Sequence, residues 1–191
     1  MPNRLCSFLL AATAAAALTS CDANDANDGP SDLSLGTFSA IVNGQAFEPP
    51  VSGALIFESG ASPLLFITGD TCANPLGTCG EQRQIVLMIG ALSGKGHYAL
   101  DALNENEGAY SVVRNDTFRT YASATTGEIV VTHYTKGKSV AGTFAFTDTD
   151  ANCGGFAETC TATVTNGRFY LPITPLTSAD AARVRTAPMR R

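Results

Sequence analysis

Short runs of β-branched and aromatic residues, each closed by a turn dipeptide, constrain the fold of this chain more than any other feature. From Thr37 onward these runs recur at short intervals, and no long segment repeats its apolar residues with the period of a helix. Asn43-Gly44 and Asn166-Gly167 are typical of type I′ hairpin turns, which need positive φ at two successive residues. Consecutive hairpins imply antiparallel pairing.

The sequence therefore predicts an all-β fold, either an antiparallel β-sandwich or a curled barrel of about ten short strands. Further turns are expected at Asn115-Asp116 and at Lys136-Gly137-Lys138. The expected strands cover residues 38–42, 45–47, 54–57, 64–68, 84–89, 97–100, 110–114, 117–122, 128–134, 139–147, 161–165 and 168–171.

Two kinds of strand can be told apart by their side-chain pattern. In the run from Val140, the even positions through Phe144 and Phe146 are apolar and the odd ones are small or hydroxylated, which predicts one face in a core and one in solvent. Leu64–Ile67 and Ile85–Ile89 are apolar on both faces. Loops or the C-terminal tail would cover the second face; the alternative is a ligand cavity or a partner surface.

The N-terminal segment has the features of an export signal. Arg4 precedes an apolar core from Phe8 to Leu18 that is too short to span a bilayer. The segment ends in Leu18-Thr19-Ser20-Cys21, which resembles the lipobox of bacterial lipoproteins. The resemblance implies a lipid on the sulfur of Cys21, cleavage before it, and localisation in the bacterial cell envelope, anchored to a membrane and facing the periplasm or cell surface. An ordinary signal peptide with a coincidental cysteine is the alternative.

These features divide the chain into four parts. Residues 1–20 are the expected signal peptide, and 21–36 are the lipidated cysteine with an acidic tether of low apolar content. Residues 37–173 are the expected β domain. Residues 174–191 form a tail with four arginines, predicted as a short helix capped by Ser178 or as a disordered end.

Six cysteines occur in the sequence. Cys6 leaves with the signal and Cys21 carries the lipid, so that Cys72, Cys79, Cys153 and Cys160 remain. In an exported chain this even set predicts disulfides. We favour the local loops 72–79 and 153–160; cross-pairing between the two loops and a four-cysteine zinc site are the alternatives.

A second resemblance covers about residues 37 to 171. Segments such as Gly142-Thr143-Phe144-Ala145-Phe146 and Thr165-Asn166-Gly167-Arg168-Phe169 look like those of an uncharacterised family of β-rich bacterial lipoprotein domains. That family has no established activity, so the resemblance implies a β-rich fold and no particular chemistry. The two cysteine loops are not part of the common pattern.

The charge balance argues against nucleic acid as a partner. The formal net charge is −5, and the β domain lacks the basic surface that phosphate backbones require. No second apolar stretch is long enough to cross a membrane, so the lipid is the expected membrane contact.

Little in the sequence points to catalysis or to a cofactor. His97 and His133 are the only imidazoles, no Gly-x-Ser-x-Gly motif occurs, and each histidine is expected on the surface of a strand. Asp148, Asp150 and Asn152 resemble the start of a calcium loop. Cys153 stands where that loop needs glycine, so calcium is a weak candidate.

The sequence thus predicts a non-catalytic binding or structural component of the bacterial envelope, held to a membrane by its lipid and in contact with an envelope protein or a small apolar ligand. Two alternatives stay open. One is a carrier of calycin type whose doubly apolar strands line a cavity. The other is an envelope hydrolase using His97, His133 or Asp150, or paired carboxylates such as Asp101 and Glu128.

Overall fold

The computed structural model describes residues 32–57, 63–73, 80–101, 105–114, 117–149 and 161–176, with only the backbone course of residues 114 and 117–125. Ten strands fill these ranges, and no described residue is helical, which confirms the predicted all-β class. The strands are β1 (Thr37–Val42), β2 (Gln45–Phe47), β3 (Val51–Phe57), β4 (Leu64–Asp70), β5 (Glu81–Ile89), β6 (Gly96–Ala99), β7 (Glu107–Arg114), β8 (Thr117–Thr135), β9 (Ser139–Thr149) and β10 (Thr161–Leu176).

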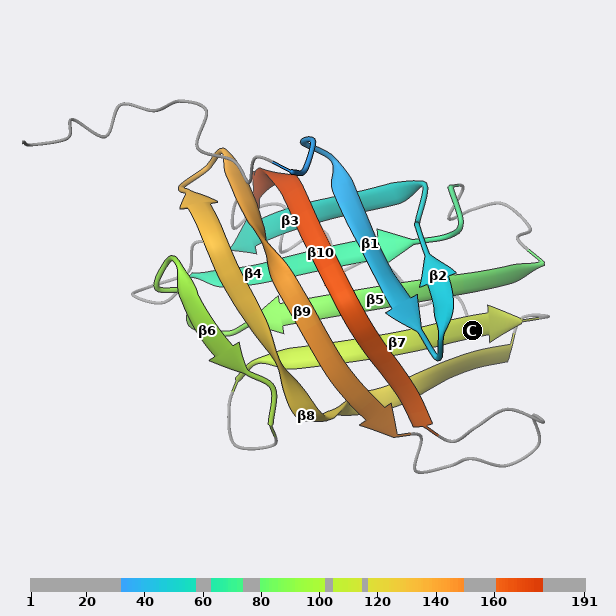
Figure 1. The fold of residues 1–191 in the computed structure, drawn as a ribbon. Coiled ribbons are helices and arrows are strands. Elements are labelled where there is room, and N and C mark those ends of the chain that lie inside the picture. Colours follow the sequence, from blue (N-terminus) through green and yellow to red (C-terminus); the bar gives the residue numbers. More distant parts are fainter. Residues whose placement is uncertain are drawn as a thin grey trace, which may run out of the picture.

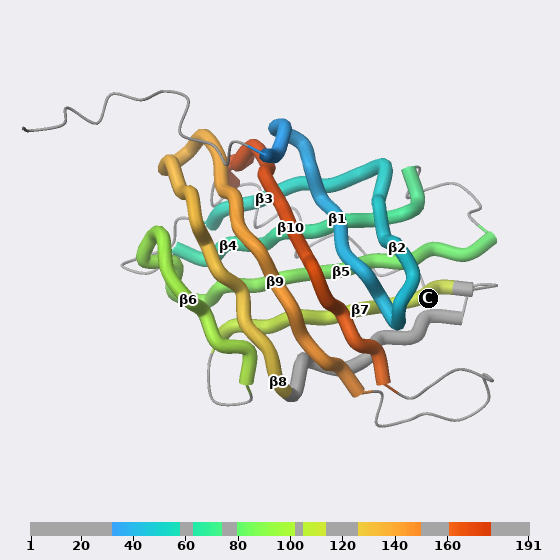
Figure 2. The backbone as a smooth tube through the Cα atoms, in the orientation of Figure 1, coloured from blue at the N-terminus to red at the C-terminus, as the bar shows by residue number. Residues whose placement is uncertain are grey.

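The strands form two layers that cross each other (Figure 1). The front layer holds β2, β1, β10, β9, β8 and β6, and the back layer holds β3, β4, β5 and β7. The long strands β8 and β10 belong to both layers, because β8 pairs first with β7 and then with β9, and β10 pairs with β9 and β1 before reaching β3. The ladder therefore runs full circle as one curled sheet, which the tube in Figure 2 makes easy to follow.

One pairing departs from the antiparallel expectation. The last four residues of β10, Ile173 to Leu176, run parallel to Ala54–Phe57 of β3. The two strands are far apart in sequence, so no hairpin dictates their relative direction. The strand also extends beyond the expected domain end at Ile173. The predicted tail helix after Ser178 lies outside the described residues.

Three of the four expected turns lie where hairpins occur. Asn43 and Gly44 have φ of 50° and 79° between β1 and β2, and Gly137 has φ of 67° in the turn between β8 and β9. Arg114 pairs with Thr117, so β7 and β8 form the third hairpin.

The predicted hairpin at Asn166-Gly167 is wrong. The chain does not reverse there, because the residues on both sides of the dipeptide pair with the same two neighbours, β1 and β9. Asn166 has φ of 52°, and the register with β9 shifts between Val164 and Gly167. One extra residue in the left-handed conformation thus forms a β-bulge inside a continuous strand.

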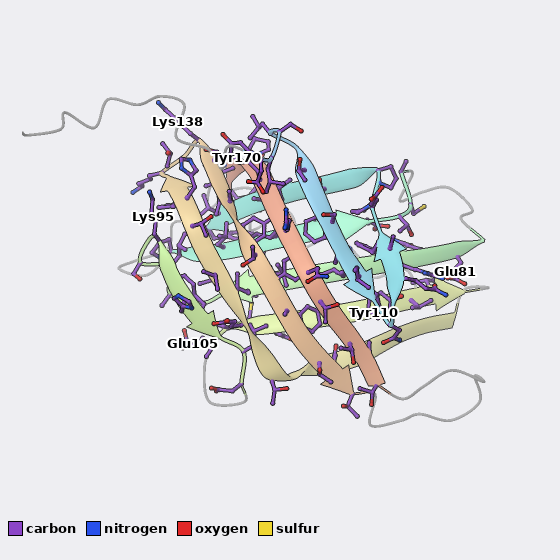
Figure 3. All side chains as sticks on the ribbon, viewed as in Figure 1. Glu81, Lys95, Glu105, Tyr110, Lys138 and Tyr170 are labelled. Carbon is purple, nitrogen blue, oxygen red and sulfur yellow. The ribbon has the colours of Figure 1, made fainter. Side chains whose placement is uncertain are left out.

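The core lies between the layers. Val140, Phe144 and Phe146 of β9 are buried, as their alternation predicts. Phe144 is the centre of an aromatic cluster, with ring centroids 5.3 Å from Phe38, 6.3 Å from Phe169 and 6.4 Å from Phe146. Figure 3 shows how side chains from both layers fill this interior. The back layer contributes seven side chains with no exposed surface, namely Ala54, Ile56, Leu65, Ile67, Ile85, Leu87 and Ile89.

The other face of β3–β5 is apolar as well. Leu55, Phe57, Phe66 and Met88 alternate with the core residues and are half-buried on the outward side of the back layer. The pairs Leu55–Phe66 and Phe66–Met88 make this face continuous across three strands. What covers it stays a prediction.

Candidate functional site

A shallow hollow lies on the outward side of the front layer, with a volume of about 260 Å³. It spans three adjacent strands, β8, β9 and β10. Its lining residues are Glu128, Val130, Thr143, Phe144, Ala145, Asn166, Gly167 and Arg168.

The hollow follows from side-chain size along β9. The outward positions of that strand carry small residues, Thr143 and Ala145 at the hollow, whereas β8 and β10 present longer side chains on either side. Val130 and Arg168 both pair with Thr143, and Glu128 pairs with Ala145, so these residues share one face of the sheet. Small residues between longer ones leave a trough.

The bulge in β10 shapes the same place. Gly167, which follows Asn166, pairs with Phe144 on the inward side. A Cβ at position 167 would lie 2.5 Å from Cδ2 of the Phe144 ring, which is closer than side chains approach. Glycine therefore lets the bulged strand settle onto the aromatic cluster, and Asn166 and Arg168 remain exposed on the wall of the hollow.

The two walls carry opposite charges. On the β8 side, Oε2 of Glu128 lies 3.1 Å from Nδ1 of His97; on the β10 side, Nη1 of Arg168 lies 3.2 Å from Oδ2 of Asp32. All four side chains are at least 53% exposed. Exposed pairs of this kind contribute about 0–1 kcal/mol, so a ligand can replace either partner at little energetic cost. The site is suited to binding a polar molecule.

His97 lies on the surface, as expected, but His133 does not. It is 7% exposed, because a register shift between Val131 and His133 places its ring beside Tyr170, with centroids 6.0 Å apart and planes at 76°. Its Nε2 lies 3.2 Å from both Oγ of Ser139 and Oγ1 of Thr135. No sequence motif signals this contact, since it depends on a hairpin and a bulge.

The His133–Ser139 contact places a hydroxyl within reach of a base. A serine nucleophile also needs a group that orients the histidine through its other nitrogen. Within the described part of the chain, Nδ1 of His133 is buried and has no hydrogen-bond partner. Among the described residues, His133 and Ser139 therefore lack the third group of a catalytic triad, the one that orients the histidine.

Asp148, the first residue of the predicted calcium site, faces the interior. Its side chain has no exposed surface, and its Oδ2 accepts a hydrogen bond of 3.2 Å from the backbone N–H of Tyr110. Asp150 and Asn152 lie outside the described residues. In the described ranges, no three metal-ligating side chains gather. The calcium site stays a prediction.

Cys72 is buried at the end of the β4–β5 ladder. Its N–H donates a 2.7 Å hydrogen bond to Oδ1 of Asp70, and Nε2 of Gln82 donates to Oδ2 of the same carboxylate at 2.6 Å. Asp70 thus links the start of this cysteine loop to β5 through hydrogen bonds. Cys21, Cys79, Cys153 and Cys160 lie outside the described residues, so lipid attachment and both disulfides stay predictions.

These features define a class of protein: an all-β domain with a filled two-layer core and a small polar hollow on one outward face. Residues 36–171 match the family described as a domain of unknown function (DUF6252), and the chain belongs to that family. This agrees with the resemblance to an uncharacterised family, although the match does not reach Cys21. No curated protein and no solved structure matches the chain. Among the described residues, no helix could cross a membrane.

Proposed function

We propose that this chain is a lipid-anchored, exported β domain that acts as a non-catalytic binding or structural component of the bacterial cell envelope. The observation that carries the proposal is the position of Cys21, which ends an apolar export segment ahead of an acidic tether. The first described strand begins at Thr37, sixteen residues after Cys21 in the sequence. Two or more acyl chains hold a soluble domain stably at a membrane.

The structure supports binding on the surface more than inside the barrel. Interior residues such as Leu87, Ile129 and Phe169 are fully buried against one another, whereas the hollow on the front layer is open and lined by exposed polar groups. This arrangement favours a polar partner over the apolar ligand of a calycin-type carrier.

Metabolic labelling tests the anchor. The full chain is expressed in bacteria fed an alkynyl fatty acid, and the label and membrane sedimentation are measured. We expect a labelled, sedimenting protein that begins at Cys21, an unlabelled protein from Cys21→Ser, and full labelling of Cys6→Ser as the matched control. An unlabelled wild-type chain that retains its first twenty residues contradicts the proposal.

A hydrolase is the second candidate, and the contact between Ser139 and His133 is the observation that favours it. Hydrolysis of p-nitrophenyl acetate by the mature protein distinguishes the two. The non-catalytic proposal predicts the same rate for wild type, Ser139→Ala and the control Thr163→Ala, which changes an exposed hydroxyl outside the hollow. A rate lost only in Ser139→Ala favours the hydrolase.

A further inference from the structure

The two charged walls of the hollow stand on opposite sides of one strand. Glu128 is on β8 and Arg168 on β10, with β9 between them. Adjacent strands are about 4.8 Å apart, so the two backbones are roughly 10 Å apart. Glu128 pairs with Ala145 and Arg168 with Thr143, which offsets the two charges by two residues along β9. A negative and a positive side chain therefore line the hollow on its two sides, and each contacts a residue outside the hollow, His97 or Asp32.

The floor between these charges consists of short, uncharged side chains. Ala145 and the methyl group of Thr143 offer apolar contact, and Val130 adds to it from β8. The hydroxyl of Thr143 and the amide of Asn166, which also line the hollow, supply hydrogen-bonding groups. A volume of about 260 Å³ is smaller than the pockets that hold drug-sized ligands, which range from about 300 to 1,000 Å³.

We propose that the hollow binds a short zwitterionic peptide, two or three residues long with free termini. Its ammonium group is bound by Glu128 and its carboxylate by Arg168, and small side chains lie over Ala145 and Thr143. Arginine suits a carboxylate because its planar guanidinium donates two parallel hydrogen bonds. This inference rests on the proposed binding role and names the ligand class for it.

His97 and Asp32 act as internal competitors for the same charges. Nδ1 of His97 lies 3.1 Å from the Glu128 carboxylate, and Asp32 forms an exposed ion pair with Arg168 at 3.2 Å. The peptide replaces these contacts at a small energetic cost. Removing the Asp32 charge frees Arg168, so Asp32→Asn binds the peptide more tightly than the wild type does.

NMR titration of the ¹⁵N-labelled mature chain tests the site. The probe is trialanine, and N-acetyl-trialanine amide is the matched neutral analogue. We expect saturable shifts of the amides of Thr143, Ala145, Asn166 and Arg168 with trialanine and at least tenfold weaker binding of the analogue, because each lost charge-assisted hydrogen bond costs about a factor of ten or more.

Charge-removing variants test the two walls separately. Arg168→Gln and Glu128→Gln are expected to weaken trialanine binding at least tenfold. Lys138→Gln and Glu48→Gln, which remove exposed charges that do not line the hollow, are the controls and leave it unchanged. Figure 3 labels Lys138.

Any of three results overturns this inference: the two probes bind equally well, the Arg168 and Glu128 variants bind trialanine as tightly as the wild type does, or trialanine leaves the amide shifts of the hollow residues unchanged. None of these results affects the lipid anchor, which is measured on Cys21. Conversely, an unlabelled Cys21 with intact trialanine binding removes the envelope proposal and leaves the peptide site standing.

Discussion

At Gly142, the absence of a side chain allows three strands to pack closely. A Cβ there would fall on the carbonyl oxygen of Val130, and it would lie 2.8 Å from Cζ of Phe169. A backbone atom cannot move aside as the end of a flexible side chain can. Glycine at this position is therefore a packing requirement of the front layer.

Gly142→Ala is expected to lower the free energy of unfolding by about 1–3 kcal/mol, the usual cost of overpacking. Gly53→Ala is the matched control, because nothing lies within 4 Å of a Cβ at that strand position. Its effect should stay within about 0.5 kcal/mol. Urea unfolding followed by circular dichroism measures both, and equal midpoints for the two variants contradict the packing argument.

Asn166 adopts a left-handed conformation that β-branched residues strongly disfavour. Its φ of 52° places it where glycine and asparagine are tolerated. Asn166→Val should therefore destabilise the domain by about 1–2 kcal/mol, and Asn166→Gly should leave stability nearly unchanged.

The neighbouring exposed residue provides the control for the bulge. Thr165→Val introduces the same side chain one position earlier and is expected to change stability by less than about 0.5 kcal/mol. Thermal unfolding of the three variants checks the comparison. If Asn166→Val is as stable as Thr165→Val, the bulge does not depend on the left-handed residue.

At the scale of the strands, local sequence signals located most elements but misjudged how far the strands run. Asn43-Gly44 and Asn166-Gly167 are identical dipeptides, yet the first closes a hairpin and the second forms a bulge. The difference lies in long-range pairing, because β1 and β9 pair with β10 on both sides of Asn166-Gly167 and so keep the strand continuous. That information is spread over distant segments and cannot be read from a dipeptide.

The last residues of β10 connect the front layer to the back layer. Ile173 is 6% exposed and pairs with Ala54, and Leu176 pairs with Phe57. The family match ends at residue 171, so this connection lies just beyond it. Without it, the edge of β3 that faces β10 would lose its partner strand.

A chain ending at Pro172 is expected to lose at least about 2 kcal/mol of stability, through the lost burial of Ile173 and the lost pairing. Amide hydrogen exchange in residues 54–57 should become faster. A chain ending at Leu176 is the control and should keep the protection of the full-length protein. Equal exchange in the two truncated chains shows that the parallel pairing does not stabilise β3.

Across the whole molecule, the candidate site was harder to predict than the fold. Alternation along β9 identified the core and the solvent face, but Glu128 and Arg168 are forty residues apart and become neighbours of one hollow only through the register of three strands. The burial of His133 likewise depends on a register shift. Site geometry in this fold comes from pairing, which residue patterns specify only indirectly.

The two predicted disulfides would stabilise separate parts of the sheet, because the two cysteine loops connect different pairs of strands. Loop 72–79 lies between β4 and β5, and loop 153–160 lies between β9 and β10. Local bridges in these loops each close about eight residues, which stabilises the folded chain by about 2.5 kcal/mol in the loop-closure model. The double variants Cys72→Ser/Cys79→Ser and Cys153→Ser/Cys160→Ser should each lose roughly this amount.

Thiol counting and peptide mapping of the mature, unreduced protein check the pairing directly. Local bridges predict no free thiol among these four cysteines and separate linked peptides for each loop. Cross-pairing predicts one linked set, and each double variant would then leave two free thiols instead of an intact second bridge.

Because both loops begin or end at strands that hydrogen bonds already hold together, we expect reduction to lower the unfolding midpoint while the β-sheet circular dichroism at low temperature is retained. Loss of that spectrum on reduction would show that the strand ladder depends on the bridges.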